Sequence, residues 1–394
     1  MRILIITSEI IKNKYSASIR TVKIIQQLSK KYEVDVITEP MSTWDFKHNI
    51  KNIYLTEYQF NNKYQNSLRK KILSKLFYIN LNFRKRLRAF KKVIKKLDLN
   101  KYDYIIAFGG GDFFIPHEVL SISKTKTKTI GYIHDPFPID LYPEPYKVAP
   151  TKRSNVDKRK FKKMLDQLDI ISFPSLLLGQ SMNNYYQFGE QKINILPHLL
   201  SKIDTSNYDE EILDSFLSKN YLIKNNYYLH AGTLLKHRVV HEIINQFKAL
   251  KKNNQLPSKF KLLFIGNVNY KIQESDDDVV FIKNRLNLDL VNGISFYAKA
   301  LLIVEHISNF SPFLPGKVPE CIAHKKPVMH FGPTNSETCR VVGQYISTDL
   351  FSAKLDDPLS IKKVLKNGGI NLSNNQSLVN YFKINGFIKD LENI

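Results

Sequence analysis

The sequence predicts an α/β protein made of two consecutive Rossmann-like domains, each with a doubly wound parallel sheet. Continuous β-branched runs alternate with stretches of helical periodicity, a pattern typical of βαβ units and parallel sheets. The series of strands is interrupted once, near residues 197–215, and then starts again. The length of 394 residues suits two hydrophobic cores better than one.

The first series of strands opens the chain. The run ILIITSEI at 3–10 is predicted to be a buried parallel strand, because it is a continuous β-branched run rather than an alternating one. Residues 19–32 follow with apolar positions at helical spacing, and 33–38 form the next strand. Later strands of this series are expected at 102–110, 128–136, 168–175 and 193–199.

The second series repeats the pattern with helices between its strands. Its strands are expected at 226–233, 261–267, 279–283 and 301–306. We therefore expect an N-terminal domain at 1–200 and a C-terminal domain at 201–374. The remaining segment, 375–394, is predicted to be helical and could pack back on the N-terminal domain.

The charge of the chain favours an anionic partner. The 59 basic and 36 acidic residues give a formal net charge of +23, which suits nucleic acid, an anionic membrane surface or a phosphorylated substrate. The two cysteines, Cys321 and Cys339, have no metal-ligand spacing, so a reducing cytoplasm is the default. Neither a signal peptide nor a transmembrane segment is recognisable, and we expect a cytoplasmic protein, at most peripheral on the inner face of the membrane.

One segment is far more basic than the rest. Residues 67–96 contain twelve Lys or Arg residues and no acid, with apolar residues at helical spacing. A surface helix with solvated lysines explains this pattern, with its apolar stripe on the core. A helix lying on anionic headgroups explains it too, and both interpretations can hold.

Polar residues that follow the strands are the candidates for chemistry, since ligands bind at the carboxyl ends of parallel strands. Gly232 and Thr233 follow one strand and are expected just before a helix, where free N–H groups favour phosphate. Lys236 and Arg238 lie just beyond and could neutralise a diphosphate. In an expected helix further on, Glu320 could accept two ribose hydroxyls and Lys317 could reach a phosphate; a helix-start carboxylate is the structural alternative for Glu320.

The run PGKVPECIAHKKPV, from Pro315 and Gly316 to residue 328, resembles a motif of GT-B glycosyltransferases, especially the family 4-like group. This resemblance implies two Rossmann-like domains that face a central cleft, with Glu320 on the nucleotide ribose. Gly232, Lys236 and Arg238 are similar to the phosphate-binding loop of that group, and Gly266 to its mid-domain glycine. Pro312 stands where the related pattern often has a second Glu.

The resemblance extends to the N-terminal half. Residues 8–29 resemble the acceptor-side loop and first helix, which contain Ser16, Ser18 and Arg20. The loop GGGD, with Gly110 and Asp112, is expected near the same site and is not a dinucleotide fingerprint.

Two residues at a strand end are the catalytic candidates. His134 resembles the family histidine that lies close to the donor sugar, and an imidazole there could bond a hydroxyl or move a proton. Asp135 is the alternative base if the reaction inverts configuration. A purely structural strand end, with a turn at Asp135, is the other interpretation.

No metal or other cofactor is expected, because the resemblance implies that GT-B sites work without one. His237 and His241 are too few for a zinc site. The acidic triplet at 276–278 precedes a strand and is predicted to be a solvated loop.

These features predict transfer of a sugar from a nucleotide-sugar donor to a hydroxyl acceptor, with retention of configuration implied by the resemblance. A glycan or lipid-linked acceptor in bacterial envelope polysaccharide or glycolipid assembly would suit the basic segment at 67–96. A nucleotide-sugar epimerase is the alternative on this fold, but it needs a carboxylate pair that is not recognisable. A basic nucleic-acid-binding protein is the non-enzymatic alternative, and it leaves residues 311–328 unexplained.

Overall fold

The structure is a computed structural model, and it describes residues 1–8, 10, 16–40, 49–57, 81–109, 114–200, 208–238, 240–272 and 275–392. The chain divides into two compact units. The first unit contains residues 1–142, 146–199 and 387–394, and the second contains 143–145 and 200–386.

The first unit is built on a seven-stranded sheet in the order β3-β2-β1-β4-β5-β6-β7, and its paired strands are all parallel. The strand order reverses between β1 and β4, as in other doubly wound sheets. The strands are β1 (Arg2–Thr7), β2 (Glu33–Thr38), β3 (Asn52–Leu55), β4 (Tyr104–Gly109), β5 (Lys128–Ile133), β6 (Ile170–Phe173) and β7 (Ile193–Ile195).

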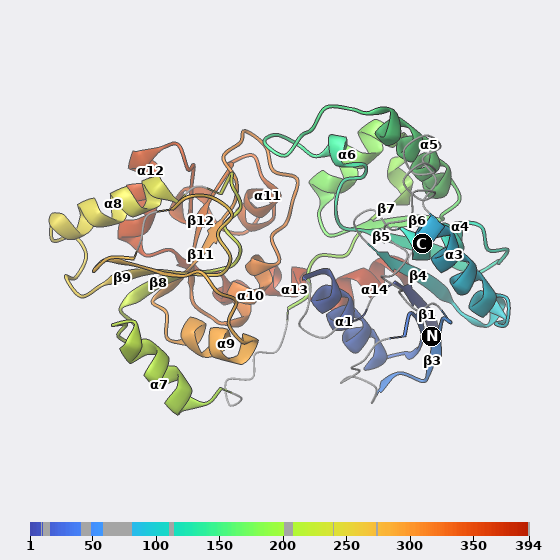
Figure 1. Ribbon diagram of the computed structural model, residues 1–394, viewed down its shortest axis with the longest axis horizontal. Helices are drawn as coiled ribbons and strands as arrows, with labels where there is room; N and C mark the ends of the chain where they lie inside the picture. The colour runs from blue at the N-terminus through green and yellow to red at the C-terminus, as the bar shows by residue number, and fades with distance from the viewer. Residues whose placement is uncertain are drawn as a thin grey trace. The chain divides into compact units, whose positions relative to one another are not determined.

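Helices cover the first sheet because apolar side chains point to both of its faces (Figure 1). On one face, Leu4 and Ile105 pack with Phe90 of α3 and Val119 of α4. The helices are α1 (Ser16–Ser29), α3 (Leu81–Ile94), α4 (Ile115–Ser121), α5 (Lys152–Asp166), α6 (Leu176–Tyr186) and α14 (Ile384–Glu392), which contributes its last turns to this unit.

The second unit has a sheet of the same kind, in the order β10-β9-β8-β11-β12-β13, with β14 antiparallel to β12. Its strand order reverses between β8 and β11. The strands are β8 (Tyr227–Ala231), β9 (Lys261–Ile265), β10 (Val279–Ile282), β11 (Ala300–Val304), β12 (Pro327–Phe331), β13 (Ser352–Ala353) and β14 (Ile370–Asn371).

Alternation along these strands produces two cores, one on each face of the second sheet. Leu229 and Leu263 face one core, whereas Tyr228 and Leu262 face the other. Helices α8 and α12 lie on one face in Figure 1, and α7, α9 and α10 lie on the other. The helices are α7 (Glu210–Lys219), α8 (His241–Lys252), α9 (Leu288–Phe296), α10 (Lys317–Ala323), α11 (Glu337–Gly343), α12 (Pro358–Asn367) and α13 (Gln376–Tyr381).

The two parallel sheets predicted from the sequence are confirmed. Each predicted strand overlaps an observed one; the strand at 33–38 has the predicted bounds, and the others are one to four residues shorter than predicted. The short edge strand β3 was not predicted; its side chains are half-buried or exposed, which weakens the apolar signal. Within 67–96, the structure describes the part from 81 onward, where the apolar stripe of α3 packs on the core as expected.

Among the described residues, no helix is long and apolar enough to cross a membrane.

Candidate functional site

The crevice beside a reversal of strand order is where ligands bind in open α/β sheets. In the second unit this point lies between the carboxyl ends of β8 and β11. Gly232 follows β8, and Glu305 and His306 follow β11. The two loops are joined there by a backbone hydrogen bond, in which the Ile307 N–H donates to the His237 carbonyl at 3.1 Å.

The loop after β8 is not the helix start that the sequence predicted. Gly232 donates its N–H to Ile265 O at 2.8 Å, and Leu234 forms a β-bridge with Val268. Helix α8 begins only at His241. Gly232 and Thr233 therefore do not supply free N–H groups at a helix start, and this part of the prediction was wrong. Non-local pairing with the β9 loop extends the strand-like segment instead.

A close backbone approach explains the glycine at 266. Gly266 has a φ of +133°, and a Cβ there would lie 2.5 Å from Gly232 O. Only glycine fits such a contact without a shift of the backbone. Gly266 thus holds the β8 and β9 loops together, and this role is sufficient to require it.

Lys317 and Glu320 lie together in the first turn of α10, as predicted. Lys317 Nζ donates to Glu320 Oε2 at 2.6 Å, and both side chains are more than a third exposed. The Lys317 stem also reaches the β8 loop, since its Cε is 3.9 Å from the position a Cβ would take on Gly232. Pro315 and Gly316 form the turn into this helix, where Val318 N–H donates to Pro315 O.

Cationic groups gather near Gly232. Arg238 lies close enough to lower the pKa of His230 and His306, although burial is the main cause in both. The buried Nε of Arg238 has no hydrogen-bond partner within the described part of the chain. Lys236 is exposed at the turn of the same loop. The structure therefore brings Gly232, Lys317 and Arg238 of the predicted set into one region at the switch point.

His230 belongs to this region but was not predicted from the sequence. Its Nδ1 lies 3.0 Å from Leu302 O, and no described residue forms a hydrogen bond with its buried Nε2. That Nε2 is 3.3 Å from the position of a Cβ on Gly232. Burial lowers the pKa of His230 to about 4, so the ring is neutral at pH 7 and Nε2 is an acceptor. A histidine within an apolar strand was the signal that could have identified it.

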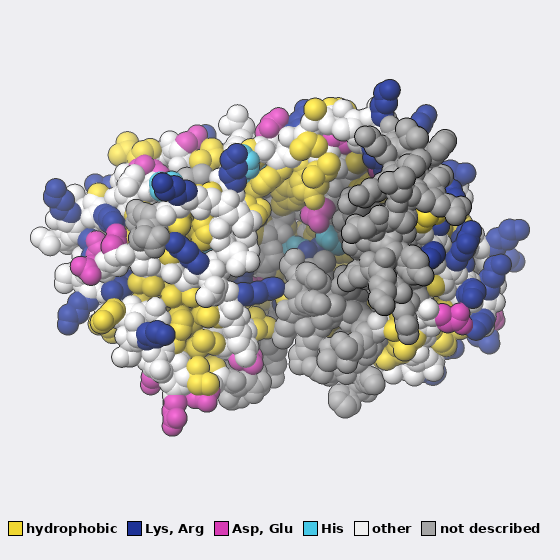
Figure 2. Space-filling model, viewed as in Figure 1, with side chains coloured by type: hydrophobic (Ala, Val, Ile, Leu, Met, Phe, Trp, Pro, Cys, Tyr) yellow, Lys and Arg dark blue, Asp and Glu magenta, His cyan; other side chains and the backbone are white. Residues whose placement is uncertain are grey.

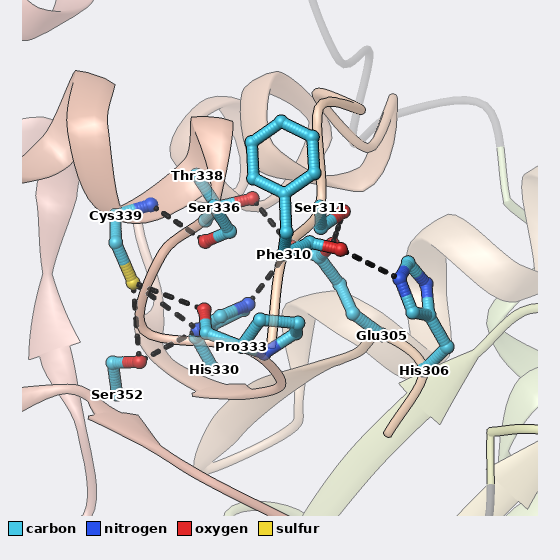
Figure 3. A network of polar contacts seen from close by, with 10 residues as sticks. All are labelled: Glu305, His306, Phe310, Ser311, His330, Pro333, Ser336, Thr338, Cys339 and Ser352. Carbon is cyan, nitrogen blue, oxygen red and sulfur yellow. Dashed lines mark hydrogen bonds and ion pairs between the residues drawn. The ribbon is translucent and has the colours of Figure 1, made fainter. Parts of the chain in front are cut away.

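A buried polar network lies at the same edge of the second sheet and was also missed (Figure 3). Glu305, 3% exposed, accepts hydrogen bonds from Ser311 Oγ at 2.6 Å and Thr338 Oγ1 at 2.7 Å. His330 Nε2 lies 2.9 Å from Glu305 Oε1, the oxygen that also accepts from Thr338, and His330 Nδ1 lies 2.8 Å from Ser352 Oγ. Cys339 Sγ contacts Ser352 Oγ at 3.3 Å.

Charge is balanced inside this network. Burial alone would lower the pKa of His330, but hydrogen bonds to Cys339 and Glu305 raise it to about 10. Burial would raise the pKa of Glu305, but the hydrogen bond from His330 and the donated hydroxyls keep it below the usual range. The geometry is that of a buried carboxylate–imidazolium pair, in which the carboxylate also holds Ser311 and Thr338.

In the first unit, the structure brings three of the predicted residues together. His134 follows β5, and its Nε2 is 3.5 Å from Asp135 Oδ2. Arg20 of α1 lies against the Tyr132 hydroxyl, and its charge acts on both His134 and Asp135. One terminal nitrogen of Arg20 is buried and finds no hydrogen-bond partner among the described residues.

The electrostatics of this cluster keep His134 neutral. Burial, then the Arg20 cation, lowers the pKa of His134 well below its usual value. Burial raises the pKa of Asp135, an effect that Arg20 opposes and that solvent limits, because the side chain is 43% exposed. A neutral imidazole can accept a proton or bond a hydroxyl group, which is the chemistry expected of it.

The other acceptor-side candidates are Ser16 and Ser18, both in α1, and two residues of the GGGD loop. Ser18 is buried in the first turn of α1, where Ser16 begins the helix. Gly110 and Asp112 lie outside the described residues.

Among the described residues, no group of three His, Cys, Asp or Glu side chains could hold a metal ion. His237 lies in the loop before α8, whereas His241 is its first residue, so they do not share a helical face. Asp276 and Asp278 pair with Lys248 and Lys251 of α8. Their lysine partners give these carboxylates a structural role.

No protein-family model and no curated protein matches the sequence. Solved structures do match its fold. A glycosyltransferase from Rickettsia africae is 13% identical, with a TM-score of 0.60 over 99% of this chain and 97% of its own. An α,α-trehalose-phosphate synthase (UDP-forming) from Burkholderia vietnamiensis is 9% identical, with a TM-score of 0.63 over 100% of both chains. HepE from Anabaena, in complex with UDP and glucose, is 13% identical, with a TM-score of 0.58 over 100% of this chain and 99% of its own.

The chain has the GT-B fold. The fold predicted from the motif at 315–328 is thereby confirmed. The resemblance to the family 4-like group in particular stays a prediction.

Proposed function

We propose that this GT-B chain is a glycosyltransferase that moves a sugar from a nucleoside-diphosphate sugar to a hydroxyl acceptor. The observation that carries the proposal is the meeting of Lys317, paired with Glu320, and Gly232 at the switch point of the second sheet. A cation beside an uncrowded backbone suits a diphosphate, and a half-exposed carboxylate one turn away suits ribose hydroxyls.

The second unit would bind the nucleotide in this proposal. Lys317 and Arg238 would stabilise the charge that develops on the leaving diphosphate, and Lys236 would add to their field. Glu320 would exchange part of its contact with Lys317 for the ribose. The neighbours found with bound UDP support a nucleoside diphosphate as leaving group, and UDP-sugars are the first donors to test.

The first unit would supply the acceptor side and the groups nearest the chemistry. His134, kept neutral by burial and Arg20, would bond a sugar hydroxyl or accept a proton, with Asp135 as the alternative base. Retention of configuration and a reaction without a metal are part of the proposal.

Calorimetric titration with UDP, GDP, ADP and dTDP, and with their sugar conjugates, tests the donor assignment. Wild-type protein should bind one nucleotide series, and Glu320→Ala should weaken that binding about tenfold or more, since hydrogen bonds to charged groups contribute roughly 1.5–3 kcal/mol. Asp349→Ala, on an exposed 3-10 turn, is the control and should bind as wild type does. Equal affinity in the Glu320 variant would contradict the ribose contact.

Product analysis separates the alternative enzyme class. Release of free nucleoside diphosphate with a glycosylated acceptor supports transfer, whereas isomerised nucleotide sugar without an acceptor would indicate an epimerase. Binding of RNA or DNA without affinity for any nucleotide would favour the nucleic-acid alternative.

We also propose that the acceptor is a glycan or lipid-linked molecule of the cell envelope, reached at an anionic membrane surface. Arg84, Lys85 and Arg88 are exposed on α3, and Figure 2 shows lysine and arginine side chains over this part of the first unit. Lys91 of α3 and Lys160 and Lys163 of α5 all act on Glu118 of α4. The basic groups of α3 and α5 therefore flank α4 and suit anionic headgroups.

Vesicle co-sedimentation tests the membrane proposal. The triple variant Arg84→Glu, Arg88→Glu and Lys95→Glu should bind phosphatidylglycerol vesicles more weakly than wild type, by about 1 kcal/mol per basic group or more. The matched control carries Lys252→Glu, Lys363→Glu and Lys366→Glu on α8 and α12, with the same change of net charge. Equal loss in both variants would indicate that net charge alone drives binding.

A further inference from the structure

The segment between β11 and α10, residues 305–316, leads directly to the proposed donor residues. We call residues 306–316 the donor loop. Ser311 is its most restrained point, because its N–H donates to Asn335 O at 3.0 Å and its carbonyl accepts from Glu337 N–H at 2.9 Å. Its hydroxyl donates to Glu305 at 2.6 Å. Ser311 is thus tied both to the loop before α11 and to Glu305, the residue that follows β11.

We propose that Glu305 is a positioning residue for the donor site, whose buried carboxylate holds Ser311 and thereby the donor loop. The inference rests on the proposed function, because the loop matters only if Lys317 and Glu320 bind the donor. Glu305 itself is 3% exposed and is occupied by three partners, so contact with the donor is not its role.

The connection from Ser311 to the donor residues is short. Leu314 is buried in the core beneath α10, Pro315 accepts the Val318 N–H, and α10 starts at Lys317. Five residues therefore separate Ser311 from Lys317, and the buried side chain of Leu314 lies halfway along. A displacement of Ser311 would be transmitted to the lysine that approaches Gly232.

The two residues that follow Glu305 in the chain link the donor loop to the β8 loop. His306 is 2% exposed, and its ring meets Phe313 of the donor loop with centroids 6.4 Å apart. The next residue, Ile307, donates its N–H to His237 O, between Lys236 and Arg238. The first residues of the donor loop, next to Glu305, therefore contact the β8 loop, which carries Lys236 and Arg238.

A buried charge makes this arrangement selective for one loop conformation. Figure 3 shows Ser311, Thr338 and His330 converging on the Glu305 carboxylate from the donor loop, α11 and β12. If the donor loop moved Ser311 away, a buried carboxylate oxygen would lose its donor, and a buried ionised group without its hydrogen bonds is strongly disfavoured. The carboxylate thus favours the loop conformation that places Lys317 beside Gly232.

The two hydroxyl groups that donate to Glu305 provide a matched pair of variants. Ser311→Ala and Thr338→Val each remove one donor from this carboxylate, and both side chains are fully buried. Only Ser311 lies in the donor loop. Affinity is measured calorimetrically with whichever of UDP, GDP, ADP or dTDP the wild-type protein binds most tightly, and melting temperature is recorded for every variant.

We expect Ser311→Ala to weaken nucleotide binding about tenfold, the effect of one hydrogen bond to a charged group. Thr338→Val should keep affinity within about twofold of wild type, because the donor loop keeps its own contact to the carboxylate. Both should lower the melting temperature, and Ser311→Ala should lower it more, because Oε1 of Glu305 keeps His330 when Thr338 is replaced. Ser311→Thr, which retains the hydroxyl, should restore most of the affinity.

Unchanged affinity in Ser311→Ala, or equal loss in Ser311→Ala and Thr338→Val, would overturn the positioning role while leaving the donor site intact. If wild-type protein binds none of the four nucleotides, the proposed function fails and the positioning role fails with it. The wild-type titration thus distinguishes the two failures.

Discussion

Two histidines at the carboxyl edges of the two sheets have pKa values shifted in opposite directions. His134 follows β5 in the first unit, and His330 is the penultimate residue of β12 in the second. Both side chains are largely excluded from solvent, at 8% and 0% exposure. The pKa of His134 lies well below its usual value, whereas that of His330 is raised to about 10.

The neighbours explain the difference. Desolvation acts in the same direction on both rings, because it penalises the charged form. Arg20 adds a cation beside His134, whereas Cys339 and the Glu305 carboxylate, which lies 2.9 Å from the ring, raise the pKa of His330. A neutral ring is available for proton transfer, whereas a charged ring paired with a buried carboxylate has a structural role. Burial alone therefore does not distinguish a candidate catalytic histidine from a structural one.

The largest expected effect concerns turnover. His134→Ala should lower kcat by about 10²- to 10⁴-fold, the usual contribution of a positioned acid or base. Donor affinity should stay near the wild-type value, because the proposed nucleotide contacts belong to the second unit. Steady-state kinetics with calorimetric binding measures both, and full turnover in this variant would make His134 a structural residue like His330.

The second prediction concerns stability. Glu305→Ala should lower the free energy of unfolding by about 3–5 kcal/mol, because it leaves His330 buried without its partner. Urea unfolding measures this. The control is Glu57→Ala, which removes an exposed ion pair with Lys92 and should cost no more than about 1 kcal/mol. A small change in the Glu305 variant would mean that His330 is neutral, and the contrast with His134 would disappear.

The third prediction concerns the pH dependence of stability. The folded-state pKa of His330 is raised above its usual value, so its stabilisation is complete below pH 6.5 and is lost as the pH rises, whereas the lowered pKa of Cys339 has the opposite effect on stability. Unfolding free energies at pH 6.5 and 9.5 should therefore show the loss in Cys339→Ser, and less of it when His330→Gln is added. Identical pH dependence in the two proteins would contradict a charged His330.

The smallest effect should follow from Arg20→Met, which removes the cation beside His134. The pKa of His134 should rise toward its usual value, because one of the groups that disfavour the imidazolium is gone. The acid limb of the pH–rate profile should then move to higher pH. An unmoved acid limb would assign the depressed pKa to burial alone.

The sequence predicted the fold and those site residues that lie close together in the chain. Apolar strand runs and their single interruption were sufficient for two parallel sheets. Lys317 and Glu320 are three residues apart on one helix, so spacing alone predicted that they would lie together. In the first unit, the predicted residues Arg20, His134 and Asp135 do lie together.

Contacts between residues that are far apart in the sequence could not be predicted in the same way. Glu305 and His330 are 25 residues apart and meet only because β11 and β12 pair in parallel, with Ile303 opposite His330. The helix expected at Gly232 was displaced by a β-bridge between Leu234 and Val268, which depends on the packing of two loops. Polar residues at the ends of apolar strands, such as His230 and Glu305, were the available signal.

The last helix has a consequence for how the protein is made. The first unit includes residues 387–394, and Phe387 and Ile388 of α14 are buried, while Glu392 lies near Tyr32 and Tyr104. The segment that completes the first unit is therefore synthesised only after residues 200–386 of the second unit. No single cut in the chain separates the two units.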